Sequence, residues 1–142
     1  MRYMCLVHFD TSVMATASGG AGQDLDRRSL AYDDTLRAAG HYLASAAIEG
    51  GDSAVLVRVR DGRMSTTDGP YMESKEQMAG FILIEARDMN EAVRLAAGIP
   101  IAALGTIEVR PVYEIPTPPP LTGPGSTSRG SIGPSAAACW PA

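Results

Sequence analysis

The segment from residue 68 to residue 76 gathers the side chains with the clearest chemical potential. It begins with Asp68 in an Asp-Gly-Pro turn, and three charged side chains follow: Glu73, Lys75 and Glu76. Neighbouring carboxylates repel one another, and in a partly dry site one of them would take up a proton, as a general acid or base must. The aspartate of such a turn can equally well serve only to cap backbone N–H groups. Asp68 is therefore predicted either as a catalytic proton carrier or as a turn residue.

Three side chains are candidates for holding a ligand. Tyr71 and Lys75 belong to the same segment, and Arg58 lies on a predicted strand before it. Lys75 is the only lysine in a chain that otherwise uses arginine. The plainer interpretation is a solvated loop in which a lysine–glutamate pair contributes less than ~1 kcal/mol.

The two histidines differ in their predicted roles. His8 lies late in the first apolar strand, and an imidazole that titrates near neutral pH makes it the best single proton carrier here. A strand histidine is more often a hydrogen-bonded core residue. His41 follows Gly40 and is predicted at the surface. No H-x-x-x-H, C-x-x-C or H-x-E spacing occurs, so we predict no metal site and no cofactor.

Composition favours a single soluble domain. The chain has 142 residues, 45% of them hydrophobic, which is enough for one packed core. Its net charge of −4 disfavours nucleic acid as a partner, because phosphates are bound by clustered basic side chains. Cys5 and Cys139 form no disulfide framework, which fits a cytoplasmic protein. No stretch approaches the ~18 apolar residues of a membrane-spanning helix.

Hydrophobic periodicity predicts the elements that would position these residues. A helix from Asp24 ends at Gly40, a second covers residues 89–97 behind an Asp88 cap, and residues 11–23 are predicted as a loop. Strands are predicted at 1–9, 42–48, 54–60, 64–67, 81–86 and 106–113, with Asp61-Gly62 forming a hairpin turn.

This order predicts an α+β, ferredoxin-like fold of the dimeric α/β barrel type. Its antiparallel sheet would carry two helices on one face and an extra β-hairpin. Strands that are apolar on both sides leave the second face uncovered, so we expect a homodimer stacked sheet to sheet. The domain is expected to span residues 1–115. Residues 116–142 are rich in Pro, Gly and Ser and are predicted to be a disordered tail.

Two segments, DGPYMESKEQMAGF (68–81) and GTIEVRPV (105–112), closely resemble the DGPF-type branch of the YCII-related family. The resemblance implies the same fold and the same dimer. The better-known YCII-like branch is associated with a histidine on the first helix and an aspartate after the second. Aligned by eye, Ser29 and Ile99 stand at these positions, so this chain cannot use that pair.

The expected function is binding of a small molecule in a cleft between sheet and helices of a homodimer, with Asp68 and His8 as the polar groups. Proteins of similar fold include monooxygenases and isomerases that work without a metal, so the enzymatic version would be metal-independent proton transfer. The alternative is a non-catalytic regulatory or interaction module, because DGPF-type relatives often accompany extracytoplasmic-function sigma factors.

Overall fold

The structure is a computed structural model that describes residues 1–16 and 20–119, without the side chains of residues 14–16. The elements in chain order are β1 (Arg2–Phe9), α1 (Thr11–Thr16), α2 (Ala21–Ala38), β2 (Tyr42–Ala47), η1 (Gly51–Ser53), β3 (Val55–Arg60), β4 (Arg63–Asp68), β5 (Gln77–Glu85), α3 (Met89–Ala97), η2 (Pro100–Ala103) and β6 (Thr106–Pro111).

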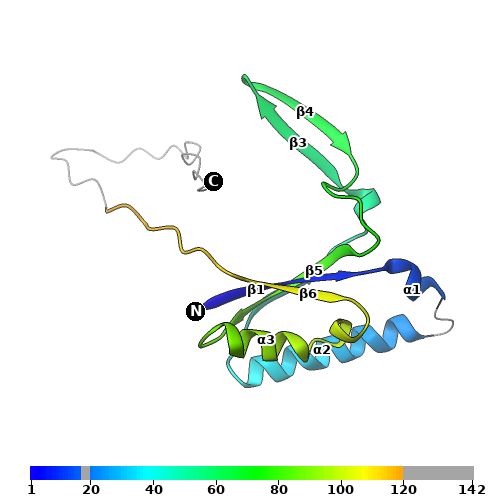
Figure 1. The fold of residues 1–142 in the computed structure, drawn as a ribbon, viewed down its shortest axis with the longest axis vertical. Helices are drawn as coiled ribbons and strands as arrows, with labels where there is room; N and C mark the ends of the chain where they lie inside the picture. The colour runs from blue at the N-terminus through cyan, green and yellow to red at the C-terminus, as the bar shows by residue number, and fades with distance from the viewer. Residues whose placement is uncertain (17–19, 120–142) are drawn as a thin grey trace, which may run out of the picture.

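Four strands form one antiparallel sheet in the order β2-β5-β1-β6, and β3 pairs with β4 in a separate hairpin. Helices α2 and α3 lie together on one side of the four-stranded sheet, while the hairpin rises on the other side (Figure 1). The prediction of a mixed α+β fold with an antiparallel sheet is confirmed. We call the side of this sheet opposite α2 and α3 the open face.

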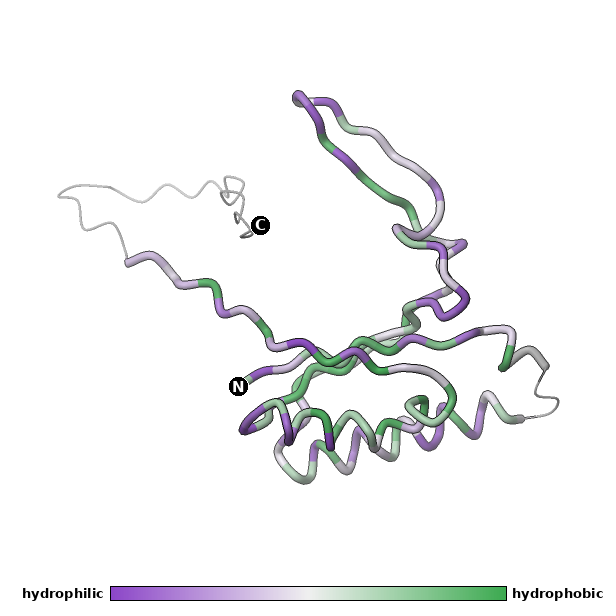
Figure 2. Tube along the Cα trace, in the orientation of Figure 1, coloured by the Kyte–Doolittle hydropathy of each residue, from purple (hydrophilic) through white to green (hydrophobic). Residues whose placement is uncertain are grey.

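The core lies between the sheet and the two helices. Tyr3 and Cys5 of β1 and Ile84 of β5 are at most 2% exposed, because alternate residues of a strand point to the same side. They pack against Leu36 of α2 and Ala92 of α3. Burial also raises the pKa of the Cys5 thiol to about 11, so this cysteine is a core residue. Apolar residues concentrate along the sheet and the facing sides of the helices (Figure 2).

The predicted loop at residues 11–23 is wrong in part, because a short helix occupies Thr11–Thr16 and α2 begins at Ala21. The carboxylate of Asp10 accepts hydrogen bonds from the Ser12 backbone N–H at 2.9 Å and the Ser12 hydroxyl at 2.6 Å. Such a cap lets a helix begin without apolar periodicity. The predicted stop is correct: Gly40 has φ 79°, a conformation that glycine tolerates well.

Strand β5 is longer than predicted, since it begins at Gln77 rather than Phe81. The extension pairs with β1 as far as Phe9 opposite Gln77, past a register shift between Val7 and His8. The final strand is shorter and ends at Pro111. Residues 116–119 are exposed and lie in no helix or strand, and the rest of the predicted tail lies outside the described residues.

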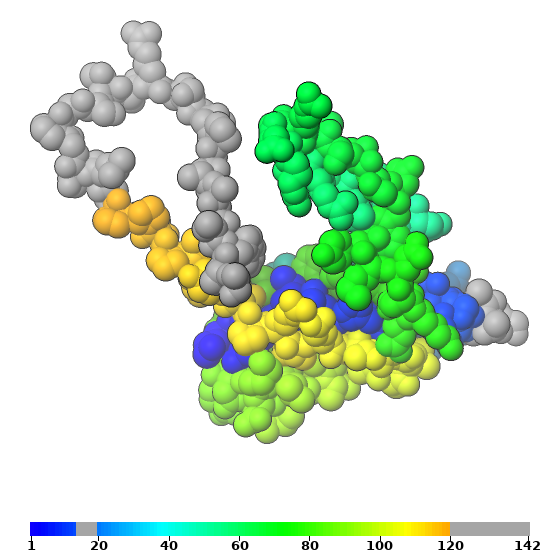
Figure 3. Space-filling model, turned by 45° about the horizontal axis from the view of Figure 1, so that its top comes forward, coloured from blue at the N-terminus to red at the C-terminus, as the bar shows by residue number. Residues whose placement is uncertain are grey.

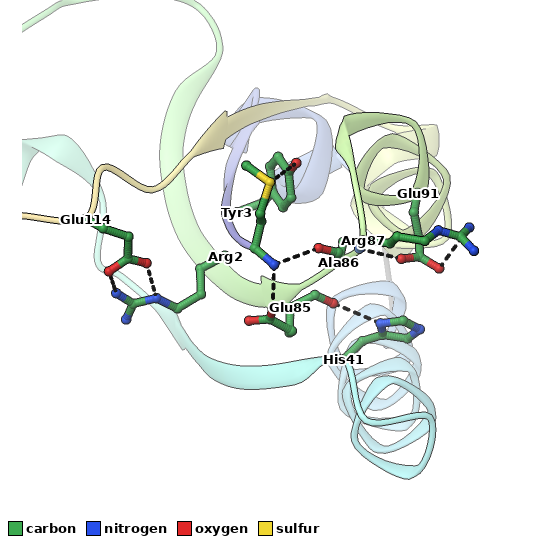
Figure 4. A network of polar contacts seen from close by, with 9 residues as sticks. Arg2, Tyr3, His41, Glu85, Ala86, Arg87, Glu91 and Glu114 are labelled. Carbon is green, nitrogen blue, oxygen red and sulfur yellow. Dashed lines mark hydrogen bonds and ion pairs between the residues drawn. The ribbon is translucent and has the colours of Figure 1, made fainter.

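His41 is half-buried and has a structural contact (Figure 4). Its Nδ1 lies 2.8 Å from the backbone oxygen of Glu85 and so donates to it, which joins the start of β2 to the end of β5. At the same end of the sheet, the Arg2 guanidinium is paired with the Glu114 carboxylate, which raises the pKa of Arg2 and lowers the pKa of Glu114. These contacts hold β2 to β5 and the start of β1 to the segment after β6.

Replacing Asp88 with alanine is expected to lower the free energy of unfolding by about 1 kcal/mol. The Asp88 carboxylate accepts a hydrogen bond from the Glu91 N–H at 2.8 Å, at the start of α3. Urea unfolding followed by circular dichroism measures the loss. Asp88→Ser keeps a capping oxygen and should recover most of it, and equal losses for the two variants would show that the cap is not the cause.

Candidate functional site

A cleft of about 420 Å³ lies between α2, the segment around η2 and the sheet. We call it the helix cleft. Its walls are mainly apolar side chains from all three elements, including Leu30, Ile82 and Ile101, and its polar groups come from α2 and β2.

Two polar residues of the helix cleft, Asp33 and Ser45, belong to a hydrogen-bonded chain that continues to Tyr42 beside the cleft. The Ser45 hydroxyl donates to Oδ2 of Asp33 at 2.8 Å, and the Tyr42 hydroxyl lies 2.9 Å from Ser45 Oγ. Because the single hydroxyl proton of Ser45 goes to Asp33, Tyr42 must be the donor to Ser45. Asp33 is half-buried, and a carboxylate can accept more hydrogen bonds than this one.

Tyr32 also lines the helix cleft, but its hydroxyl is already used. It donates to the backbone oxygen of Leu95 at 2.7 Å and so ties α2 to α3. Burial raises the pKa of Tyr32, which keeps this hydroxyl protonated and able to donate. Tyr32 is therefore part of the wall of the cleft, whereas the Asp33 carboxylate can accept a hydrogen bond from a ligand.

A second cleft, of about 600 Å³, lies where the base of the hairpin meets β1 and β5. We call it the His8 cleft. Atom Nε2 of His8 is shielded from solvent and has no hydrogen-bond partner among the described residues. Oε2 of Glu108 lies 3.6 Å from this atom, which is ion-pair distance for a protonated imidazole.

The structure separates the two predicted proton carriers. His8 lines the second cleft, whereas Asp68 ends β4 with an exposed side chain and lines neither cleft. The turn after Asp68 is closed by backbone groups, since the Gly69 N–H donates to the Ala54 oxygen at 2.8 Å and Gly69 has φ 107°.

The three predicted ligand-binding residues also lie apart. Tyr71 lines the His8 cleft but is 80% exposed. Lys75 is 4.0 Å from the Asp10 carboxylate, with its side chain largely in solvent. Arg58 pairs with Ser65 in the hairpin, in register between the pairs that contain Val57 and Val59. It therefore points to the opposite side of the hairpin from Asp68.

Of the two glutamates that follow the turn, Glu76 lines a cleft and Glu73 does not. Glu76 lines the His8 cleft, and its Oε2 accepts a hydrogen bond from the Thr106 hydroxyl at 2.8 Å. Glu73 is exposed and lines neither cleft. Among the described residues, no three His, Cys, Asp or Glu side chains gather where they could hold a metal ion.

Asp33 and Ser45 were not predicted from the sequence as site residues of the helix cleft. A signal existed for Asp33, because it follows Ser29 by one helical turn and shares its side of α2. Ser45 was visible as the one serine of β2, a strand of otherwise apolar residues and Tyr42. Neither signal says that the two side chains meet.

The elements and the cleft define a class: a small antiparallel α+β domain with a mainly apolar cleft between its sheet and its helices. Residues 1–116 match the YCII-related domain family, and the chain belongs to that family. It is 31% identical over 114 residues to an uncharacterised protein from Rhizobium meliloti (strain 1021), covering 79% of this chain and 92% of that protein.

Among solved structures, it is similar to the 5-chloro-2-hydroxyhydroquinone dehydrochlorinase TftG of Burkholderia phenoliruptrix AC1100, in complex with 2,5-dihydroxybenzoquinone. The TM-score is 0.44 at 16% identity, covering 80% of this chain and 94% of that one. Within the described residues, no helix has the length and apolar character needed to cross a membrane.

Ser29 and Ile99 both line the helix cleft, although they are far apart in the sequence. That these two positions correspond to the histidine and aspartate of the YCII-like branch stays a prediction from the sequence. The structure therefore brings the two positions to one cleft, where this chain has a serine and an isoleucine. The carboxylates that line this cleft, Asp26 and Asp33, both come from α2, and Asp33 is the half-buried one.

Proposed function

We propose that the protein binds a small molecule in the helix cleft and that Asp33 is its main recognition group. The observation that carries the proposal is a half-buried carboxylate with unused acceptor capacity in a cleft whose walls are otherwise mainly apolar. Ligand sites typically enclose ~300–1,000 Å³ and combine apolar walls with a few convergent polar groups. A volume of about 420 Å³ fits that description.

The lining indicates the chemical class of ligand. Apolar walls from α2, β5 and η2 favour a compact apolar or aromatic body. The Asp33 carboxylate favours a hydrogen-bond donor on that body, such as a hydroxyl or an amine. We therefore propose a small aromatic molecule that bears a hydroxyl or amino group.

Metal-independent proton transfer is the catalytic form of this proposal. Asp33 would accept a proton from the bound hydroxyl or amine, while the Ser45 hydroxyl, held by Tyr42, orients the carboxylate. The proton-carrier roles predicted for His8 and Asp68 stay separate predictions, because neither residue lines the helix cleft.

We infer a ferredoxin-like fold of the dimeric barrel type in a cytoplasmic homodimer. The strand order β2-β5-β1-β6, with α2 and α3 on one side, supports the fold. The apolar, half-buried side chains of the open face support the dimer, because they include Leu6 and Phe81 and face away from both helices.

Binding is tested by screening small hydroxylated and amino-substituted aromatic compounds with a thermal-shift assay and measuring Kd by calorimetry. Asp33→Asn should weaken the best compound by about 10-fold or more, because the amide keeps the shape and loses the charge. Asp34→Asn is the matched control: Asp34 pairs with Arg37 on the same helix and lines neither cleft.

The outcomes separate the candidate functions. Equal affinity for wild type and Asp33→Asn would contradict the role of Asp33. A compound that shifts the NMR signals of His8 and leaves those of Asp33 unchanged would move the site to the His8 cleft. A screen in which no compound binds would contradict the proposal and favour the non-catalytic interaction module.

A further inference from the structure

The His8 cleft is a second cavity, on the open face of the sheet, whereas the helix cleft lies on the face that α2 and α3 cover. The segment that leads from the hairpin into β5 lies over the end of β1 and forms one wall of this cavity (Figure 3). A volume of about 600 Å³ is ample for a small molecule. Because the sheet separates the two clefts, each can bind a ligand without the other.

A β-bulge lies beside His8 in the floor of this cleft. Val7 is opposite Gly80 and His8 is opposite Met78, so Ala79 is an extra residue in β5. Directly opposed residues of antiparallel strands share a side of the sheet, and both His8 and Met78 line the cleft. Bulges redirect side chains and are frequent next to active sites. This bulge brings His8 and Met78 together at the cleft.

Glu108 is held in a position that orients the His8 ring. Its Oε1 accepts hydrogen bonds from Nε and Nη2 of Arg110, each at 2.6 Å. Its Oε2 lies 3.6 Å from Nε2 of His8, and this pair needs to close by only ~0.4 Å to form a hydrogen bond. A carboxylate accepts hydrogen bonds and donates none, so Glu108 favours the imidazole tautomer with its proton on Nε2 and its lone pair on Nδ1.

Nδ1 is the nitrogen of His8 that a ligand can reach. Nε2 is shielded from solvent, yet 27% of the side chain is exposed. Among the described residues, Nδ1 has no hydrogen-bond partner, and it is not shielded as Nε2 is. In the tautomer that Glu108 favours, Nδ1 is an acceptor, so the ligand group that binds it is a donor. Donation to Nδ1 also strengthens the contact between Nε2 and Glu108, because linked hydrogen bonds polarise one another.

The lining of the His8 cleft favours a neutral molecule with an apolar body. Its walls are mainly apolar and include Met72 and Met78, whose flexible thioethers pack well against aromatic rings. Among the described residues, no arginine or lysine lines the cleft, whereas Glu49 and Glu76 do, so an anionic ligand is repelled. The Glu76 carboxylate already accepts a hydrogen bond from Thr106, and burying a cation against apolar walls is costly.

We propose that the His8 cleft is a second ligand site, for a neutral aromatic molecule that donates one hydrogen bond to Nδ1 of His8. Glu108, held by Arg110, is a positioning residue that keeps the Nδ1 lone pair available. The ligand supplies a partner to an imidazole that has no hydrogen bond among the described residues. The helix cleft lies on the other side of the sheet, and ligand binding there can fail without affecting this proposal.

NMR of the histidine ring nitrogens, on the full chain with two matched compounds, tests the site. Indole donates one hydrogen bond and accepts none, whereas 1-methylindole has nearly the same body and no donor. At pH 8, where an ordinary imidazole is neutral, indole should shift the His8 signals and bind at least ~10-fold more tightly than 1-methylindole. His41 is the only other histidine of the chain and lines neither cleft, so its signals should stay unchanged.

Two variants separate binding from positioning. His8→Phe keeps a flat ring in the strand but has no acceptor, so the two compounds should bind it within ~2-fold of each other. Glu108→Leu should weaken indole binding at least ~3-fold and leave 1-methylindole binding unchanged, which a merely structural role would not do. Equal weakening of both compounds, or of neither, would show that Glu108 does not position His8.

The wild-type protein alone can overturn the proposal, so the test does not depend on the folding of a variant. The His8 site is wrong if indole leaves the His8 signals unchanged, or if it binds no more tightly than 1-methylindole. Indole that binds only in the helix cleft, beside Asp33, would leave the His8 signals unchanged. That result would refute the His8 site and leave the proposed function of the helix cleft intact.

Discussion

Replacing Ile84 with alanine is expected to lower the free energy of unfolding by about 3–4 kcal/mol. Ile84 is 1% exposed and lies in the core beside Tyr3 of β1 and Tyr42 of β2, its partners in the sheet. Removing its outer carbons leaves a cavity at the centre of the sheet, where rigid neighbours on both sides limit relaxation. A domain of this size has about 5–15 kcal/mol of total stability, so the loss should be plain in urea unfolding.

Leu83→Ala is the matched control, one residue away on the open face. Leu83 is half-buried in a single copy, so its own loss should be about 1 kcal/mol when the protein is dilute. If a second copy covers the open face, the loss should grow with protein concentration, whereas the loss at Ile84 should stay constant. If Ile84→Ala and Leu83→Ala lowered the free energy of unfolding by the same amount at every protein concentration, the assignment of Ile84 to the core and Leu83 to the open face would be wrong.

The strands of the sheet were largely predictable from sequence. Alternation in β1 and the apolar run in β5 follow from side chains that point to opposite sides of a strand. Asp88 and Gly40 marked helix ends correctly, because capping and left-handed glycine are local effects. Strand alternation and helix ends could be predicted because they depend on residues that are close together in the sequence.

Two features of the fold were harder to predict from the sequence: the start of β5 and the helix α1. The Gln77 end of β5 is a strand because it pairs with Phe9, which is far away in the sequence. The short helix α1 depends on the cap from Asp10, whose signal is weak without apolar periodicity. The start of β5 depends on a tertiary contact that overrides local propensity, whereas α1 depends on a local cap that no apolar periodicity accompanies.

In the candidate sites too, the residue type could be recognised from the sequence, whereas its partner depended on the fold. His8 was recognised from its type, but Glu108 could be found only from the register, which places Leu6 opposite Glu108 and His8 opposite Thr106. These pairings bring Glu108 diagonally next to His8 on the open face. Asp33 and Ser45 likewise meet only because α2 packs beside β2.

The second large effect is expected at Gly80, where alanine should cost about 3 kcal/mol. Gly80 lies in β5 between its two neighbouring strands, opposite Val7 of β1 and Ala47 of β2. An added Cβ would lie 2.5 Å from the backbone oxygen of Ala46. A backbone atom cannot rotate away as a side chain can, so edge strand β2 would have to move. Urea unfolding measures the loss, and faster amide exchange in β2 would show which strand yields.

Gly62→Ala separates this close contact from the cost of backbone conformation. Gly62 has φ 73°, and an added Cβ there has no atom within 4 Å, so its cost should stay near 1 kcal/mol. Gly80 and Ala46 both line the helix cleft, so displacement of β2 should also weaken any ligand bound there. If Gly80→Ala were as mild as Gly62→Ala and left β2 exchange unchanged, the sheet would have room beside Gly80. The tight fit of β2 against β5 would then be wrong, and with it the shape of the cleft that these strands enclose.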